Sequence, residues 1–316
     1  MKRLAVAALA LLAFAGSACS GGKERVREAP AGPRVIRDLD PTELLPGDLD
    51  LVVRIDLARM RSALGPASGG EIARRALASG APLDAGEPEI REALRCADVV
   101  WYGTRVADLE AGDHVIIVEG RDCLPELGRG RWHTVRSANG SLRIFDREGE
   151  AKRPGTARII NLANRAIAFV SPVELDSVKR VLDKGPDDRR GVPKGEGIVS
   201  FDLRAGRLSP GVEKRFPAVG RLVEGLDRMK GQIVLDDAGL RVDAQIAGKT
   251  KAGAERAQKF VEALKESLKG SRYEAMLGEL KAELVESTVR LKVVVPMKAL
   301  QELMPREEAA PAPPPK

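Results

Sequence analysis

Apolar and polar residues alternate in several short stretches of this chain, with the two-residue period of strands that bury one face. The alternation predicts strands over residues 49–57, 98–105, 114–119, 132–136, 141–145, 158–162, 166–170, 229–235 and 240–247. Turn-forming pairs such as Asn139-Gly140 and Asn164-Arg165 separate neighbouring stretches. Consecutive strands are therefore expected to form antiparallel hairpins.

A different pattern, with apolar residues three or four positions apart, predicts a helix from Ala254 to Leu268. Charges of both signs cover its other side, which favours packing against a sheet over binding to a membrane surface. Further helices are expected over 71–78 and 173–182. The predicted fold class is α+β, a mainly antiparallel sheet with helices packed on one face.

One combination of alternation and charge occurs twice. Residues 52–62 and 198–209 both run from alternating apolar residues into Asp-Leu and then Arg, which aligns Asp56 with Asp202, 146 positions later. A duplication would divide the chain into two related β-rich halves, 44–184 and 198–304, joined by a linker over 185–197 that is rich in Gly, Pro and charge. The alternative is a chance match between alternating strands.

The N-terminal residues have the three-part pattern of a secretory signal peptide. Lys2 and Arg3 give a positive start, and 12 apolar residues follow, from Leu4 to Ala15. This run is shorter than the roughly 20 apolar residues that cross a bilayer as a helix. We therefore expect residues 1–18 to be a signal peptide and the mature chain to be exported.

The residues that follow resemble the lipobox of bacterial lipoproteins, in which small residues precede a lipidated cysteine. Ser17 and Ala18 match this pattern, whereas Gly16 stands where the family has Leu or another aliphatic residue. The resemblance implies that Cys19 is the lipid attachment site and that 19–43 is a flexible tether to the membrane. Ser20 after the cysteine, in place of Asp, implies the outer membrane, with the chain facing the periplasm or the cell surface. Cleavage by an ordinary signal peptidase, which leaves Cys19 as a free thiol, is the alternative.

The chain has three cysteines, so lipidation of Cys19 leaves Cys96 and Cys123 as a pair. An exported protein can keep a disulfide, and these two residues bracket the predicted hairpin 98–119 nearly symmetrically. Antiparallel pairing would bring their Cα atoms within the roughly 4.4–6.8 Å that a disulfide spans. Such a bridge would stabilise the fold by ~3–4 kcal/mol. Two buried free thiols are the alternative.

The charge distribution and composition argue against a nucleic-acid partner. The formal net charge is +6, but 52 basic and 46 acidic residues are interspersed and form no basic stripe. Aromatic residues make up 3% of the chain, which leaves few side chains for base stacking. The proline-rich segment 305–316 is expected to be a disordered, solvated tail.

No motif identifies a reaction. His114 and His133 lie in predicted strands without metal-ligand or catalytic neighbours, and both are expected to be exposed. Gly248-Lys249-Thr250 precedes a helix, but Asp243 stands where a phosphate loop needs glycine, so a strand-to-helix turn is predicted. The acid-rich segment 38–50 lacks the spacing of a calcium-binding EF-hand loop. The sequence predicts no catalytic residue, no cofactor and no metal site.

Three classes of function remain, since the folded region resembles no specific family. The favoured one is a lipid-anchored envelope protein without enzymatic activity, a scaffold or binding protein with an envelope protein partner. The second is a periplasmic carrier of a lipid or small apolar ligand, held in a cavity between sheet and helices. The third is an envelope hydrolase whose acids are brought together by the fold.

Overall fold

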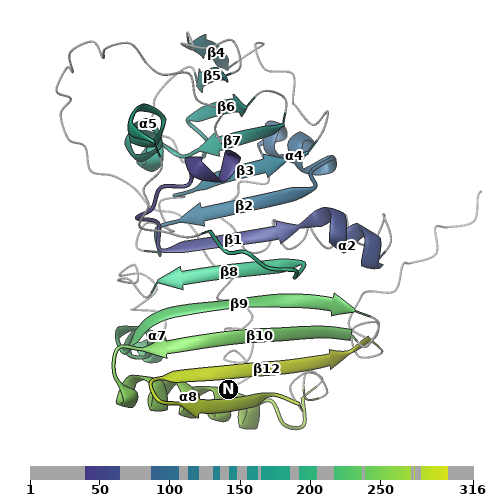
Figure 1. The fold of residues 1–316 in the computed structure, drawn as a ribbon, viewed down its shortest axis with the longest axis vertical. Helices are drawn as coiled ribbons and strands as arrows, with labels where there is room; N and C mark the ends of the chain where they lie inside the picture. The colour runs from purple at the N-terminus through teal and green to yellow at the C-terminus, as the bar shows by residue number, and fades with distance from the viewer. Residues whose placement is uncertain are drawn as a thin grey trace, which may run out of the picture.

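The structure, a computed structural model, describes residues 40–64, 87–106, 113–120, 131–135, 142–147, 155–162, 165–185, 192–204, 217–236, 239–271, 274 and 279–297. Within these ranges 12 strands form one antiparallel sheet, in the spatial order β11-β12-β10-β9-β8-β1-β2-β3-β7-β6-β5-β4 (Figure 1). The strands are β1 Leu51–Asp56, β2 Val99–Thr104, β3 Val115–Glu119, β4 Trp132–Val135, β5 Leu142–Arg147, β6 Arg158–Leu162, β7 Ala166–Val170, β8 Val199–Arg204, β9 Leu226–Asp236, β10 Gly239–Gly248, β11 Lys281–Val285 and β12 Thr288–Pro296. The helical elements are η2 Pro41–Leu44, α2 Leu57–Leu64, α4 Pro88–Arg95, η4 Pro172–Glu174, α5 Leu175–Lys184, α7 Pro217–Glu224 and α8 Lys251–Ser267. The predicted α+β class with a mainly antiparallel sheet is confirmed.

The hairpins expected from the turn residues are present. β2 pairs with β3, β4 with β5, β6 with β7 and β9 with β10, all antiparallel. The strong helix is α8, which begins three residues before its predicted start because the Thr250 hydroxyl caps it, accepting a hydrogen bond from the Gly253 N–H at 3.2 Å. The predicted helix over 71–78 lies outside the described residues.

Several elements were not predicted, among them α2, α4 and β11. α2 follows β1 directly, because the Asp56 carboxylate accepts a hydrogen bond from the Arg59 N–H at 2.9 Å and so caps the new helix. β11 is only five residues long, and an alternation of that length is hard to separate from chance. α4 is only eight residues long and starts with Pro88. So short a segment gives little periodicity from which to predict a helix.

The first strands of the two predicted halves, β1 and β8, are neighbours at the middle of the sheet. Arg54 lies directly opposite Ser200, which is the residue 146 positions later in the sequence alignment. On either side of this pair, Val53 lies opposite Phe201 and Ile55 lies opposite Val199. In the sequence repeat Val53 is equivalent to Val199, and Ile55 to Phe201. The two strands are therefore related by a local twofold axis between Arg54 and Ser200. The register therefore agrees with the sequence repeat.

The strand order is also alike in the two halves. β1-β2-β3-β7-β6 in the first half has the same arrangement as β8-β9-β10-β12-β11 in the second, and β4 and β5 extend only the first. In both halves three strands form a meander and the last hairpin returns to the third strand. This topology is what a duplication predicts, although the sheet runs continuously from one half to the other. The duplication itself stays a hypothesis.

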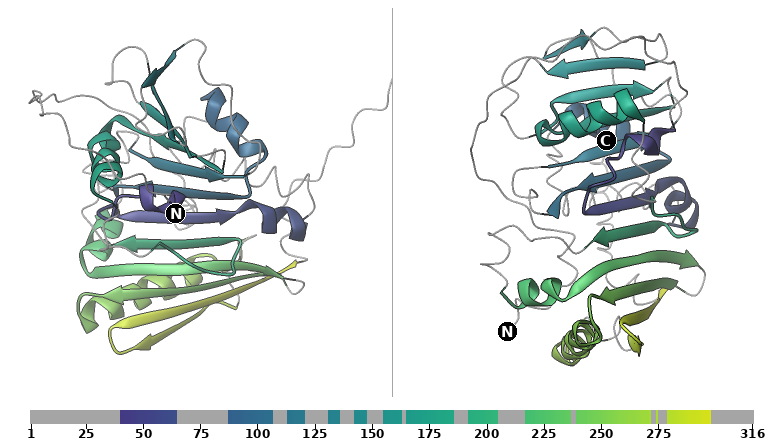
Figure 2. Two further views of the ribbon diagram at one scale, coloured as in Figure 1. Left: turned by 45° about the horizontal axis from the view of Figure 1, so that its top comes forward. Right: turned by 60° about the vertical axis from the view of Figure 1, so that its left-hand side comes forward.

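The two sides of the sheet are named here after the helices that pack on them (Figure 2). On the α8 face, α2 and α4 cover a core around Val53, Ile116 and Phe169 in the first half, and α8 covers Ile246 and Val289 in the second. On the α5 face, η2 and α5 cover a second core in the first half. Most α-helices thus share one face as predicted, whereas α5 and the short η2 pack on the other.

The N-terminal and C-terminal predictions lie outside the described residues. These are the signal peptide 1–18, the lipid attachment site Cys19, most of the tether 19–43 and the proline-rich tail 305–316. In the described ranges, no helix is both long enough and apolar enough to cross a membrane.

Candidate functional site: a cationic groove on the open sheet face

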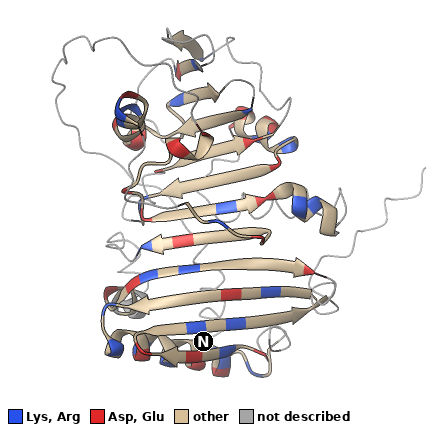
Figure 3. Cartoon of the chain, in the orientation of Figure 1, with Lys and Arg blue, Asp and Glu red and all other residues tan. Residues whose placement is uncertain are grey.

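The α5 face of the second half has no helix of the described chain packed on it. A groove with a volume of about 520 Å³ lies there, over β8, β9, β10 and β12. Charged residues are frequent on these strands (Figure 3). This open and charged surface is the candidate functional site.

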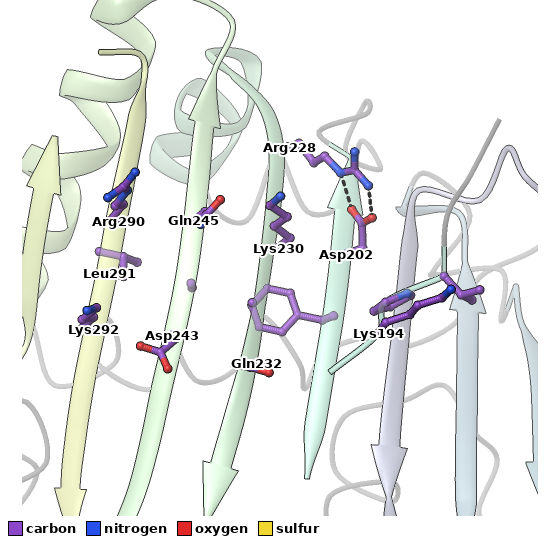
Figure 4. A pocket seen from close by; sticks show the side chains of 15 residues that line it. Lys194, Asp202, Arg228, Lys230, Gln232, Asp243, Gln245, Arg290, Leu291 and Lys292 are labelled. Carbon is purple, nitrogen blue, oxygen red and sulfur yellow. Dashed lines mark hydrogen bonds and ion pairs between the residues drawn. The ribbon is translucent and has the colours of Figure 1, made fainter. Parts of the chain in front are cut away.

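Two rows of side chains cross the groove at right angles to the strands. The first row is Asp202, Lys230, Gln245 and Arg290, which lie opposite one another on successive strands. The second row is Ser200, Gln232, Asp243 and Lys292. Directly opposed residues of antiparallel strands point to the same side of a sheet, so both rows lie on the α5 face. All of their members except the buried Ser200 line the groove (Figure 4).

The two acids of the groove are already paired with arginines. Asp202 is only 4% exposed, and both of its carboxylate oxygens accept hydrogen bonds from the Arg228 guanidinium, one of them at 2.8 Å from Nε. This bidentate contact raises the pKa of Arg228. Asp243 accepts a hydrogen bond from Nε of Arg241 at 3.1 Å. Neither carboxylate is therefore left to neutralise the remaining cations.

Residues 192–197, which belong to the predicted linker, form one wall of the groove and are called the strap here. Val192, Pro193 and Lys194 line the groove directly. At Gly195 an added Cβ atom would lie 2.7 Å from the Ser200 hydroxyl and 2.9 Å from the Gln232 side-chain oxygen. These side-chain ends can move aside, but at Gly197 an added Cβ atom would lie 2.5 Å from the Ile233 carbonyl oxygen. The backbone cannot move aside as easily, so the close approach of the strap to the sheet requires glycine at Gly197.

Arg54 on the neighbouring strand β1 holds the strap in place. Its Nη1 atom donates to the carbonyl oxygens of Gly195 and Gly197, each at 3.5 Å, and its Nη2 atom donates to Asp56 at 2.8 Å. The guanidinium also lies over the Trp101 ring, 5.7 Å from its centroid. The strap is therefore fixed to the central strands of both halves.

A second polar cluster lies buried in the first half, where β3 begins and α5 approaches. The Asp113 side chain accepts hydrogen bonds from the Arg105 N–H at 2.7 Å and from the Ser171 hydroxyl at 3.1 Å. Glu174 binds Nε of Arg105 at 2.5 Å. Burial and then the nearby charge of Glu174 raise the pKa of Asp113 to about 7. Because Asp113 and Glu174 are both 0% exposed, this cluster joins elements of the fold and offers no surface to a ligand.

The histidines and the Gly-Lys-Thr motif take ordinary places. His133 is exposed on β4 as expected, but His114 is buried, with its Nε2 atom 3.4 Å from the Thr156 hydroxyl. Gly248, Lys249 and Thr250 form the turn from β10 into α8, as predicted. Within the described ranges, no group of three or more His, Cys, Asp or Glu side chains could hold a metal ion.

The cysteine predictions stay predictions. Cys96 is the C-cap residue of α4, whereas Cys19 and Cys123 lie outside the described residues. The structure therefore gives no distance for the expected Cys96–Cys123 pair.

The groove was not predicted, although the sequence carries a signal for it. Every second residue of β9, β10 and β12 is charged or an amide in the stretches 228–232, 241–245 and 290–292. Such alternation shows that one side of each strand is polar. It does not show that these sides adjoin, because that depends on the strand order and register.

Comparisons with known proteins give a fold and no family. No family model matches the chain, and neither does any curated protein. Among solved structures, crystal form I of the protein TP0453 matches with a TM-score of 0.50 and 11% sequence identity, over 84% of this chain and 96% of that chain. Crystal forms III and IV of TP0453 match with TM-scores of 0.47 at 12% and 10% identity. At this identity the likeness to crystal form I shows a shared fold alone.

Proposed function

We propose that this chain is a lipid-anchored protein of the bacterial cell envelope that acts without catalysis, by binding a partner protein. The anchor is the lipid expected on Cys19, which would place the folded part beside the outer membrane. The binding surface is the groove on the α5 face of the second half. Scaffold and binding proteins need such a surface and no reactive side chain.

The observation that carries this proposal is the contrast between the faces of the sheet. In the first half, described helices cover both faces, and in the second half α8 covers one. On the α5 face of the second half, the cations of the groove face solvent without a described element over them. Large charged surfaces of this kind steer association with oppositely charged partners.

The carrier alternative receives less support from the groove. Nine of the 15 residues that line it are Lys, Arg, Gln or Asp, although apolar atoms contribute more than half of its lining surface. Pockets for apolar ligands instead carry only a few polar groups among hydrophobic residues. The hydrolase alternative needs acids that are free to act on a substrate. Asp202 and Asp243 are instead held by arginines.

Crosslinking in intact envelopes, followed by purification of the chain, tests the proposed function. We expect recovery of a specific envelope protein with the native chain. The Cys19→Ala variant should leave the membrane fraction after a carbonate wash and recover less of this protein. Failure to recover any envelope protein above background would contradict the binding function, and a Cys19→Ala chain that stays in the membrane pellet would contradict the anchor.

A further inference from the structure

The groove carries positive charge that the described part of the chain does not neutralise. Lys194, Lys230, Arg290 and Lys292 are exposed and make no ion pair or hydrogen bond with described residues. Glu283 lies opposite Arg290 in the sheet register but does not pair with it. The groove is therefore an attractive surface for an anionic ligand.

The spacing of these cations suits an extended chain. Arg290 and Lys292 are two residues apart on β12, about 7 Å, and Lys230 is two strands away from Arg290, about 10 Å. Side chains on the same side of an extended peptide also repeat every ~7 Å. Carboxylates at alternate positions of such a peptide could reach Arg290 and Lys292 together.

The groups between the cations distinguish a peptide from a simpler anion. Gln232 and Gln245 lie on the two middle strands, and a carboxamide both donates and accepts hydrogen bonds. The backbone of a bound peptide needs both kinds of partner, whereas phosphate groups need donors alone. The half-buried valines Val234 and Val294 lie on the same face, beyond the second row, and can contact apolar side chains.

We propose that the groove binds an extended, acidic segment of a partner protein, with Lys230, Arg290 and Lys292 pairing with its carboxylates. This inference rests on the proposed binding function and adds the chemistry of the partner. Gln232 and Gln245 would hold the peptide backbone between the charge pairs. The strap would border the bound segment on the side of β8.

Titration of a fluorescent peptide of alternating Glu and Val with the purified chain, read by anisotropy, tests the inference. We expect saturable binding that weakens as salt is raised, because exposed ion pairs are screened. The variant Lys230→Glu/Arg290→Glu should weaken binding by about tenfold or more, since it replaces two attractions with repulsions. The control Lys251→Glu/Lys259→Glu changes the net charge equally on exposed positions of α8 and should change binding by less than about twofold. Thermal unfolding of all three chains verifies that they are folded.

Inorganic polyphosphate and vesicles that contain phosphatidylglycerol serve as competing anions. If either binds the groove more tightly than the peptide, the ligand is a phosphate polymer or a membrane surface and the inference is wrong. Equal loss of peptide binding in the groove variant and the α8 control would also overturn it. If the peptide does not bind but an envelope protein is still crosslinked, the acidic-peptide inference fails and the proposed function stands. If the peptide binds the groove but no envelope protein is recovered, the proposed function fails.

Discussion

The α5 faces of the two halves occupy equivalent positions in the sheet but differ in chemistry. One row of side chains crosses the whole sheet through Arg54 and Ser200 at its centre. Towards the first half this row continues with Trp101, Ile117 and Ala168, all buried under η2 and α5. Towards the second half it continues with Gln232, Asp243 and Lys292, which line the groove.

The side chains, and not the strand order, determine whether a face of the sheet is covered by a helix. Both halves have the same strand order and the same antiparallel hydrogen bonding, so topology does not determine whether a face is covered. The first half places apolar residues on its α5 face, which a helix then removes from water. The second half places cations and amides there, and burial of unpaired charges would cost several kcal/mol. The second half can therefore leave this face open to a partner.

The largest expected difference is between the stability losses caused by substitutions at equivalent positions of this row, one in each half. Ile117 is 0% exposed, so Ile117→Ala should lower the free energy of unfolding by about 2–5 kcal/mol. The equivalent change in the second half, Asp243→Ala, removes only an exposed ion pair and should cost less than about 1 kcal/mol. Urea denaturation of both variants measures the two free energies. Similar losses would contradict the contrast between a covered and an open face.

A smaller difference in the free energy of unfolding is expected between substitutions of two arginines of the groove, Arg228 and Arg290. Arg228→Ala leaves the buried Asp202 carboxylate without its bidentate partner and should cost about 1–3 kcal/mol. Arg290→Ala removes an exposed side chain without a described partner and should change stability by less than about 0.5 kcal/mol. The same denaturation experiment measures both. If Arg290 proves the more destabilising, its assignment to ligand binding is wrong.

The buried cluster of the first half should make stability depend on pH. The pKa of Asp113 is raised from 3.8 to about 7 in the folded chain, so the folded state holds a proton that the unfolded state releases. The stability that this proton adds to the folded state is complete below the pKa of 3.8 in the unfolded chain and is lost by the time the pH has risen through 7. Between these two values the free energy of unfolding falls by up to about 1.4 kcal/mol per pH unit. Asp113→Asn should flatten the fall in unfolding free energy between about pH 4 and pH 7. An unchanged slope would show that another group is responsible.

The smallest effect is expected at the strap. Arg54→Ala removes the hydrogen bonds to the carbonyls of Gly195 and Gly197, so backbone amides of the strap should exchange hydrogen faster. Arg290 lies on the same face but does not hydrogen-bond to the strap, so Arg290→Ala is the matched control. Hydrogen exchange read by mass spectrometry compares peptides that contain residues 192–197. Equal exchange in the native and Arg54→Ala chains would show that other contacts hold the strap.

Local features of the fold could be predicted from sequence, and non-local ones could not. Alternation and turn residues located most strands and hairpins, and the spacing of Ala257, Phe260 and Val261 located α8, because both depend on neighbouring residues. The groove instead depends on contacts between distant segments, such as Arg54 with Gly195 and Gln245 with Arg290 across the β10–β12 register. The repeat at Asp56 and Asp202 aligned the two central strands, yet the two acids act differently. Asp56 caps α2 and also pairs with Arg54 on its own strand, whereas Asp202 pairs with Arg228 on the next strand.

Site-specific photo-crosslinking in intact envelopes tests most directly whether the open face is the binding surface. A crosslinking amino acid at Gln245, in the middle of the groove, is compared with one at Glu262, on the exposed side of α8. We predict that Gln245 yields a discrete crosslinked envelope protein, that Glu262 does not, and that Lys230→Glu/Arg290→Glu removes the Gln245 product. A product that forms equally from both positions, or that survives the charge reversal, would contradict a binding site in the groove.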